Sequence, residues 1–272
     1  MRIAVLGLLA ACGSSSRHTP DAGAQDARAI DSMIDAAPDA ATCAAKPASL
    51  AGRWRADMNA NDSAGTYNGT THGTLTYTAG KYGSAFALDG STSYVTVDDG
   101  DTLWPAGSFS ISAWINTEYN TGQIVEKYQC WDSCTVNVSN AYWALYVLDG
   151  DAGFDTRSDA STSTNTVLDT HSIADGQWHQ IVGVRDSTMS KMILYVDGTA
   201  VGSQALNSVD NGAMTNNDGE VDPITIGAQG VATQPSYAPN FNGWIDEVAY
   251  FGDALTPQQV ADMYGLPQGL CP

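Results

Sequence analysis

The stretch Phe241-Asn242-Gly243-Trp244-Ile245-Asp246-Glu247-Val248 joins a tight-turn residue to a run of apolar and aromatic side chains. Three earlier stretches have the same form, namely Asp175-Gly176-Gln177-Trp178-His179, Leu194-Tyr195-Val196-Asp197-Gly198 and Ile226-Gly227. A turn residue beside such a run is the pattern of a β-hairpin. The C-terminal part of the chain is therefore predicted to be built from hairpins.

Strand patterns continue from this region back toward the N-terminus. We expect strands over 52–56, 74–78, 84–88, 94–97, 109–116, 123–128, 142–148, 178–185, 191–196, 224–227 and 243–251. In 109–116 the alternation of a strand places Ile111, Ala113 and Ile115 on one face and Trp114 on the other. Many short strands separated by Gly and Asp turns predict an all-β fold, a two-sheet antiparallel jelly-roll sandwich.

One short C-terminal helix is expected after these strands. Thr256 is a good N-cap, Pro257 suits the first helical position, and Val260 and Met263 supply an apolar face. No internal repeat is visible in the sequence, which indicates one folded domain.

Ordered motifs along the chain resemble a known family. They are Trp54-Arg55-Ala56-Asp57, Asp62-Ser63-Ala64-Gly65, Gly80-Lys81-Tyr82-Gly83, Phe86-Ala87-Leu88-Asp89-Gly90, Ser110-Ile111-Ser112-Ala113-Trp114, Gly176-Gln177-Trp178, Val196-Asp197-Gly198, Gly243-Trp244-Ile245-Asp246-Glu247 and Ala254-Leu255-Thr256-Pro257. In this order they resemble the LamG-like jelly-roll domains of the concanavalin A-like lectin/glucanase superfamily. The resemblance runs from about Trp54 to Tyr264 and implies a concanavalin A-like sandwich.

Charge excludes some classes of partner. The chain has 272 residues, with Lys+Arg 11 against Asp+Glu 30 and a net charge of −19. Nucleic acids and anionic lipid surfaces attract basic proteins, so neither is an expected partner. The acidity is compatible with divalent cations and favours solubility.

The N-terminus has the form of a targeting segment. Residues 1–11 contain a short apolar run that ends in Leu9-Ala10-Ala11 before Cys12. This resembles the lipobox of a bacterial lipoprotein, which implies removal of 1–11 and lipidation of Cys12; the alternative is a chance cysteine. Residues 12–47 are rich in Ala and Asp and have almost no apolar bulk, so they are expected to be a disordered tether to the domain at 48–272. The expected location is the outer membrane or the cell surface.

Four cysteines remain if Cys12 is lipidated. An even number of cysteines in an exported chain indicates disulfides. Cys130 and Cys134 are close enough in sequence to close a small loop, and Cys43 and Cys271 bracket the domain. We expect these two pairs. A zinc site is a weak alternative, because the four histidines are scattered.

Catalytic motifs are missing from the sequence. Glucanases of the superfamily carry Glu-x-Asp-x-x-Glu on one strand, and this chain has no such run. Asp246 and Glu247 are adjacent, so alternation predicts that they point to opposite faces. His179 is a candidate general base, although a role in anchoring its turn by hydrogen bonding is the simpler interpretation. We expect no enzyme activity and no catalytic residue.

A structural calcium ion is the one expected cofactor. The polar loop that contains Asp62 and Asn68 offers the oxygen ligands that calcium prefers. The family resemblance implies that this loop meets Asp246, with Asp62 and Asp246 sharing the ion. The alternative is that Asp62 opens an Asx turn and Asp246 makes a buried hydrogen bond.

The segment 119–143 is rich in aromatic residues and is the expected ligand surface. Tyr119, Tyr128 and Trp131 are predicted to bind ligand, with Trp131 exposed at the tip of the Cys130–Cys134 loop, whereas Tyr142 and Trp143 are expected in the core. Aromatic rings on a rigid loop can stack on a sugar or contact a protein. The predicted function is a surface-anchored carbohydrate-binding module. The alternatives are an adhesion domain that binds an extracellular protein and, more distantly, a glycoside hydrolase.

Overall fold

The computed structural model describes residues 42–128, 141–161, 163–215, 221–229 and 240–272. Cys12, Cys130, Trp131 and Cys134 lie outside these ranges. The strands are β1 (Leu50–Trp54), β2 (Gly69–His72), β3 (Thr76–Ala79), β4 (Ser84–Asp89), β5 (Tyr94–Val97), β6 (Phe109–Asn116), β7 (Gly122–Tyr128), β8 (Tyr142–Leu148), β9 (Asp151–Arg157), β10 (Asn165–Ser172), β11 (Trp178–Asp186), β12 (Lys191–Val196), β13 (Thr199–Ala205), β14 (Ile224–Ile226) and β15 (Asn242–Phe251). The helix α1 spans Pro257–Gly265.

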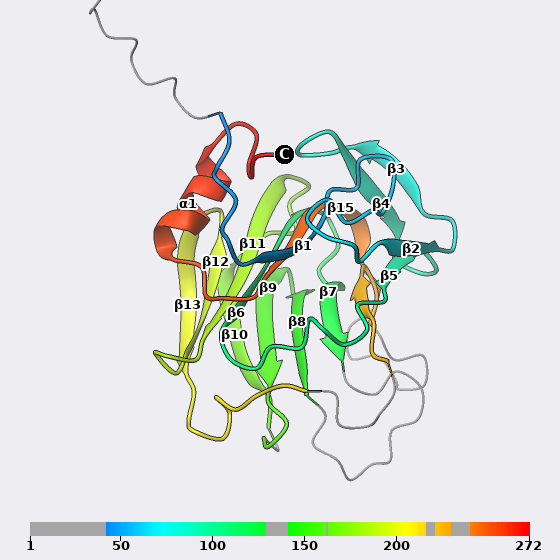
Figure 1. The fold of residues 1–272 in the computed structure, drawn as a ribbon. Helices are drawn as coiled ribbons and strands as arrows, with labels where there is room; N and C mark the ends of the chain where they lie inside the picture. The colour runs from blue at the N-terminus through cyan, green and yellow to red at the C-terminus, as the bar shows by residue number, and fades with distance from the viewer. Residues whose placement is uncertain (1–41, 129–140, 162, 216–220, 230–239) are drawn as a thin grey trace, which may run out of the picture. The chain divides into compact units, whose positions relative to one another are not determined.

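These strands form two antiparallel sheets, as the all-β jelly-roll prediction requires (Figure 1). The eight-stranded sheet has the order β13-β12-β11-β6-β15-β4-β3, and β1 pairs with the second half of β15. The seven-stranded sheet has the order β10-β9-β8-β7-β14-β5-β2. Strands distant in sequence are neighbours, so the C-terminal end of β6 lies between the N-terminal ends of β11 and β15 at one end of the sandwich.

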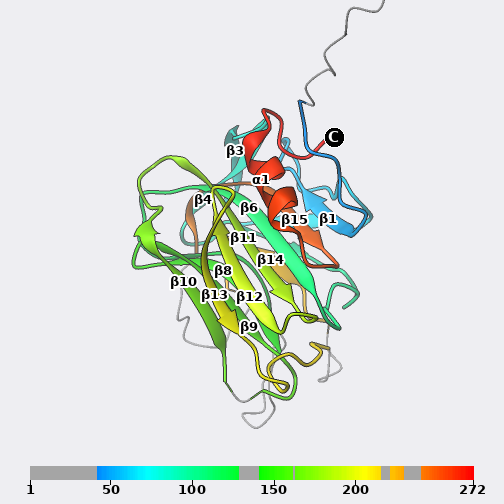
Figure 2. The same ribbon diagram turned by 90° about the vertical axis from the view of Figure 1, so that its left-hand side faces the viewer.

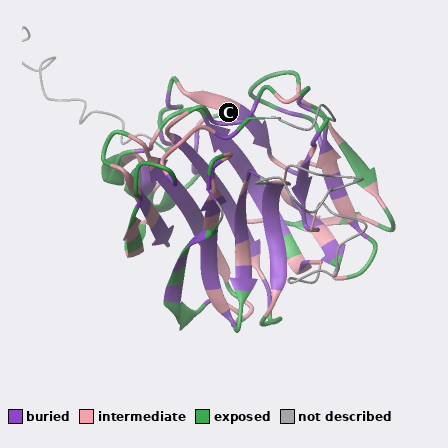
Figure 3. Cartoon of the chain, turned by 90° about the horizontal axis from the view of Figure 1, so that it is seen from below, coloured by how far each residue is buried: buried purple, intermediate pink, exposed green. Residues whose placement is uncertain are grey.

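The core lies between the inner faces of the two sheets. The alternation expected for 109–116 is confirmed, because Ile111, Ala113 and Ile115 are buried in this core. Trp143 is also part of it, as predicted. In Figure 3 the central strands are almost continuously buried, and the exposed segments are mostly turns and sheet edges.

Helix α1 covers part of the outer face of the eight-stranded sheet (Figure 2). The Thr256 hydroxyl accepts the Gln259 backbone N–H, and the Gln259 side chain returns a bond to the Thr256 backbone, so the helix begins at a capping box. Val260 and Met263 pack on Val182, Tyr195, Ala249 and Phe251 in a second apolar cluster. None of the helices among the described residues is long and apolar enough to cross a membrane.

The two ends of the domain are joined. Cys43 and Cys271 form the predicted disulfide, which confirms that pair. The backbone of Ala44 bonds with that of Gly269 and Cys271, and Ala44 is buried. Residues 43–47 were expected to belong to the tether, but Cys43 and Ala44 are part of the folded domain, since they pair with its C-terminus.

Four strands were not predicted from the sequence. β2, β10 and β13 lie at sheet edges, where one side faces solvent and the residues are mostly polar or small. β9 is central, but it carries Gly153, which leaves room for the Tyr146 ring; an added Cβ would lie 2.3 Å from that ring. None of these segments has the apolar run from which a strand is usually predicted.

Candidate functional site

Two tryptophans stand on the outer face of the eight-stranded sheet, beside the C-terminal end of β6. Trp178 of β11 and Trp244 of β15 both pair in register with Asn116, the last residue of β6. Residues paired in an antiparallel register share a face, so Trp178, Asn116 and Trp244 form one row, the tryptophan row. The ring centroids of the two tryptophans are 6.2 Å apart, although β6 lies between their strands.

Glycine and hydrogen bonds fix this row. The Asn116 side chain donates to the Gly176 carbonyl at 2.8 Å, which holds the turn that leads into Trp178. Gly243, before Trp244, has a φ of 142°, and an added Cβ would lie 2.4 Å from the Asn116 carbonyl oxygen. The Thr117 hydroxyl donates to the Asn242 carbonyl at 2.7 Å. The two tryptophans are therefore held by backbone that tolerates little change.

A hollow of about 300 Å³ lies beside Trp244. It is lined by Asn116, Thr117, Glu118, Tyr119, Gly176, Asn242, Gly243 and Trp244. Trp244 is 40% exposed and Tyr119 is 55% exposed. An open aromatic surface next to a carboxylate and amides can stack on an apolar face and bond to hydroxyl groups at the same time.

The predicted ligand residues are not all brought together. Tyr119, before β7, lies in the hollow. Tyr128, at the far end of β7, packs on Tyr142 with ring centroids 5.5 Å apart. Trp131 lies outside the described residues, so its exposure stays a prediction, as does the Cys130–Cys134 disulfide.

The prediction that Tyr142 lies in the core is wrong. Its hydroxyl oxygen lies 2.7 Å from the Thr164 hydroxyl and 3.3 Å from Asp155 Oδ2, and the Tyr146 hydroxyl donates to Asp155 Oδ1 at 2.8 Å. This cluster sits on the outer side of the seven-stranded sheet, since Tyr142 precedes the inward-facing Trp143 in β8. Burial raises the pKa of Asp155. The cluster bonds mainly to itself, which fits a structural role.

The sequence prediction missed the tryptophans as site residues. Both were visible as residues that follow a turn glycine, in Gly176-Gln177-Trp178 and Gly243-Trp244. Their pairing through Asn116 depends on strand order, which joins residues 116, 178 and 244. The sequence alone does not give that order.

His179 anchors the adjoining turns by hydrogen bonds. Its Nδ1 lies 2.8 Å from Asp197 and its Nε2 lies 3.1 Å from Asp175, so both ring nitrogens are hydrogen-bonded. The bond to Asp197 raises the pKa of His179, and the bond to Asp175 adds to that rise. A general base needs a free nitrogen directed at substrate. This arrangement supports the simpler interpretation of the residue.

The prediction that Asp246 and Glu247 point to opposite faces of their strand is wrong. Glu247 has a φ of 51° and occupies a bulge, where the register of β15 on β6 shifts between Asp246 and Ala249. Asp246 shares a row with outward-facing Trp114, and Glu247 bonds to Arg53 of β1 at 2.7 Å and to Arg55 at 3.3 Å. Both carboxylates therefore lie on the outer side of the sheet, because a bulge inserts an extra residue.

This carboxylate pair is not arranged for glycoside hydrolysis. Asp246 is fully buried and accepts the Tyr82 backbone N–H at 2.9 Å through Oδ2, while Oδ1 has no partner among the described residues. Burial raises the pKa of Asp246 to about 8, and the nearby Glu247 adds to the rise. Glu247 is held by two arginines. Within the described part of the chain, neither group meets an open cleft in which a sugar and a water could sit.

The predicted calcium ligands do not form a shared site. Asp62 accepts the backbone N–H groups of Arg53 and Ala64 on Oδ1, at 2.9 and 2.8 Å, and that of Tyr67 on Oδ2, at 3.2 Å. Asn68 Oδ1 accepts the Asp62 N–H. The described residues contain no group of three His, Cys, Asp or Glu that could hold a metal. These donors do not fit an ion shared with Asp246, and calcium stays an untested prediction.

Comparison with known proteins gives a family and a set of similar folds. The model of a laminin G-type family, described as the concanavalin A-like lectin/glucanases superfamily, matches residues 89–261. No curated protein matches the chain.

Domain 4 of AbnA, a GH43 extracellular arabinanase from Geobacillus stearothermophilus, is similar with a TM-score of 0.61. That structure is a complex with arabinotriose. The identity is 24%, and the match covers 80% of this chain and 100% of that one.

The binding domain of botulinum neurotoxin DC is also similar. Its complex with SialylT has a TM-score of 0.57 at 15% identity, and its complex with rat synaptotagmin II has 0.58 at 16%. Each match covers 81% of this chain and 52% of the toxin chain, so this chain spans about half of that domain. At these identities the likeness shows the fold.

Proposed function

This chain belongs to the concanavalin A-like lectin/glucanase superfamily, and from that premise we propose that it is a non-catalytic carbohydrate-binding module. A shared fold does not fix a ligand, so the proposal rests on the site. The observation that carries it is the pair Trp178 and Trp244, whose ring centroids are 6.2 Å apart, with Trp244 lining a hollow that also contains Glu118 and Asn242. One of the similar structures is a complex with arabinotriose and another is a complex with SialylT, which supports glycan as the ligand class.

The shape of the site favours a glycan over a protein partner. Stable protein interfaces bury about 800 Å² of surface per partner. Here the exposed aromatic rings border a hollow of about 300 Å³ that also contains Glu118 and Asn242. Sugars need this mixture, because their C–H faces stack on aromatic rings while their hydroxyls bond to carboxylates and amides. A protein ligand is the second candidate, supported by the synaptotagmin complex of a similar domain.

Neutral glycans are the expected class. The chain has a net charge of −19, and Glu118 lines the hollow. A carboxylate in the site repels sialic or uronic acids and accepts bonds from neutral sugar hydroxyls. The preferred ligand is therefore a neutral oligosaccharide.

Replacing Trp244 tests the proposal. Trp244→Ala should weaken binding to the best neutral glycan on an array by about tenfold or more, the effect of a modest hot spot, with little change in melting temperature. Leu168→Ala is the matched control, because Leu168 is 43% exposed but lies on β10 of the other sheet. Unchanged affinity in Trp244→Ala, or a wild-type chain that binds no glycan, would reject the proposal.

Surface anchoring through Cys12 extends the proposal to location. The support is the lipobox-like sequence and the Cys43–Cys271 disulfide, since disulfides persist in oxidising, extracytoplasmic compartments. Cys12→Ser should abolish palmitate labelling and release the protein. Labelling that persists in the variant would contradict the anchor.

A further inference from the structure

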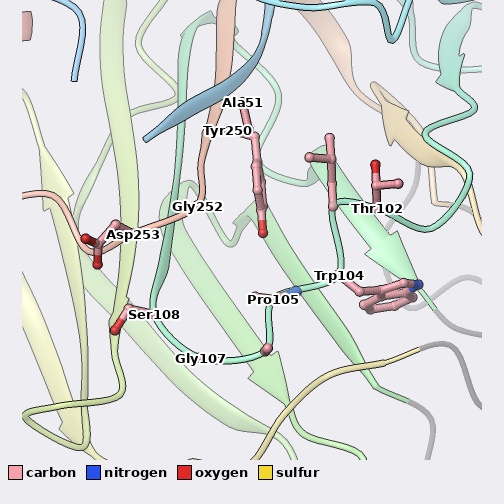
Figure 4. A pocket seen from close by; sticks show the side chains of 11 residues that line it. Ala51, Thr102, Trp104, Pro105, Gly107, Ser108, Tyr250, Gly252 and Asp253 are labelled. Carbon is pink, nitrogen blue, oxygen red and sulfur yellow. The ribbon is translucent and has the colours of Figure 1, made fainter. Parts of the chain in front are cut away.

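A second cavity lies at the other end of β15. Its volume is about 600 Å³, and it is bounded by the β5–β6 connection, the start of β1 and the segment after β15 (Figure 4). Tyr250 and Trp104 give it aromatic walls, and Asp253 lies at its rim. This volume is in the range of small-molecule sites.

The Tyr250 hydroxyl opens into this cavity. Tyr250 is only 3% exposed, and its ring packs on Phe109 and Trp143 at centroid distances of 5.9 and 5.7 Å. Figure 4 shows the hydroxyl directed toward the segment of Pro105 and Gly107. No described residue donates to it or accepts from it. Because this hydroxyl opens into the cavity and has one O–H to donate and lone pairs to accept, a ligand or water in the cavity can bond to it.

Other polar groups around the cavity are already bonded. The Trp104 indole N–H donates to Asp101 at 3.2 Å, and Lys127 Nζ lies 4.9 Å from the centroid of its ring. The Thr102 hydroxyl bonds to Tyr67 and the Asp99 carbonyl, and that of Ser108 bonds to Ser187. Among the side chains of the described lining residues, the groups left for a ligand are the Tyr250 hydroxyl and the exposed Asp253 carboxylate, whose Oδ1 also accepts the Ala254 N–H at 2.8 Å.

These groups define the chemistry of the occupant. Burial raises the pKa of Tyr250, so its hydroxyl stays protonated and can donate or accept. The Asp253 carboxylate accepts only, and it repels anions. A sugar residue has apolar C–H faces for the walls and hydroxyls that both donate and accept.

We infer that this cavity, the Tyr250 cavity, is a second carbohydrate subsite that takes one residue of a neutral sugar. The inference rests on the proposed glycan-binding function. Trp244 and Gly252 are eight residues apart along one extended segment, which separates the two sites by about 25 Å at ~3.3 Å per residue. A trisaccharide cannot fill both sites at that distance. One domain would therefore hold two glycan segments at once and gain avidity on a dense glycan surface.

Indole NMR separates the two sites. The full chain carrying Cys12→Ser, with ¹⁵N-labelled tryptophan, is titrated with arabinotriose, cellotriose and mannotriose. The Trp244 indole signal reports the tryptophan row, and the Trp104 signal reports the Tyr250 cavity. We expect both signals to shift with at least one of the three sugars.

Variants test which residues cause the shifts. Tyr250→Phe should weaken the Trp104 response about five- to tenfold and leave the Trp244 response unchanged, since it removes one hydrogen bond. Gly252→Leu should remove the Trp104 response; a Cβ at Gly252 meets only the Ser49 carbonyl, at 3.9 Å, so the fold tolerates the change. Tyr195→Phe is the matched control, because Tyr195 is also 3% exposed but lies under α1.

The outcomes distinguish the second subsite from the proposed function. A Trp244 shift without a Trp104 shift overturns the second subsite, leaves the proposed function standing and indicates a cavity that holds only water. A Trp104 shift without a Trp244 shift supports the cavity and rejects the tryptophan row. No shift at either indole with any of the sugars rejects both.

Discussion

Two neighbouring rows on the same face of β11, β6 and β15 have opposite roles. The tryptophan row of Trp178, Asn116 and Trp244 is open, whereas the next row, Gln180, Trp114 and Asp246, is covered. The two rows lie on the same strands and the same face, each contains tryptophan, and they are two residues apart. The difference lies in what the rest of the chain places over each row.

Trp114 is covered from three directions. The Tyr82 ring meets it edge-on at 5.9 Å, the Tyr264 ring stacks on it at 5.6 Å, and Lys81 Nζ lies 4.2 Å from its ring centroid. Among the described residues, Trp244 has only Trp178 as an aromatic neighbour. An aromatic side chain on this sheet therefore stabilises the fold where loops and α1 cover it, and is available to a ligand where they do not.

The largest expected effect is on the covered row. Trp114→Ala should lower the free energy of unfolding by about 3–5 kcal/mol, because it removes a buried ring and leaves a cavity beside the three residues that pack on it. Trp244→Ala should change it by less than about 1 kcal/mol. Urea unfolding of both variants measures the contrast. Equal losses would mean that the exposed row is structural and that the two rows do not differ in role.

The second effect concerns Asp246. Its pKa of about 8 in the folded state, against 3.8 as the ordinary value, means that the folded state binds more protons between these values. Stability therefore falls as pH rises from about 4 to 8, and the loss is complete above 8. Asp246→Asn keeps an oxygen for the Tyr82 N–H and cannot ionise. It should raise the free energy of unfolding by at least about 2 kcal/mol at pH 9 and by little at pH 4.

Unfolding curves at several pH values check this prediction. The gap between wild type and Asp246→Asn should open between pH 4 and 8 and then level off. Asp155→Asn is a useful second variant, because burial also raises the pKa of Asp155, although on the other sheet. A gap that is independent of pH would show that the Asp246 carboxylate keeps an ordinary pKa.

A smaller effect is expected at Glu118, beside the open row. Glu118→Gln should raise the affinity for a sialylated glycan by roughly two- to fivefold, the scale of an exposed charge interaction, and leave a neutral glycan nearly unaffected. Added salt should reduce the difference, because the charge is exposed. Calorimetric titration with one neutral and one sialylated trisaccharide measures it. Equal changes for both would indicate that Glu118 bonds to the sugar rather than selecting its charge.

The smallest expected effect is that of calcium. Since backbone N–H groups already occupy both oxygens of Asp62, added calcium or a chelator should not shift the melting temperature. Binding to the folded state alone would raise it by mass action. A calcium-dependent rise that disappears in Asp246→Asn would restore the shared ion and give the covered row a second role.

Most interior strands were predictable from sequence, whereas the edge strands β2, β10 and β13 were not; the exceptions are edge strand β3, which was expected, and interior strand β9, which was missed. The segment 109–116 alternates over its whole length, and its observed bounds match those expected. β10 and β13 alternate weakly, because solvent accepts either kind of residue at an edge. The disulfide between Cys43 and Cys271 followed from an even number of cysteines bracketing the domain.

The site was less predictable because it depends on long-range contacts. Sequence motifs showed Trp114, Trp178 and Trp244 as strand residues but could not show which of them the 80–83 loop and α1 would cover. Alternation failed at Glu247, since a bulge adds one residue without any mark in the sequence. Tyr119, one of the predicted ligand residues, is 55% exposed, and its role in binding stays a prediction.

The disulfide between Cys43 and Cys271 also closes the chain between these two residues into a covalent ring. A protease that cuts one surface loop between these residues linearises the ring but sheds no fragment. The disulfide holds the two pieces together. The strands of both pieces therefore stay close enough to remain paired in the sheets. A molecule cut once therefore stays in one piece until its disulfide is reduced.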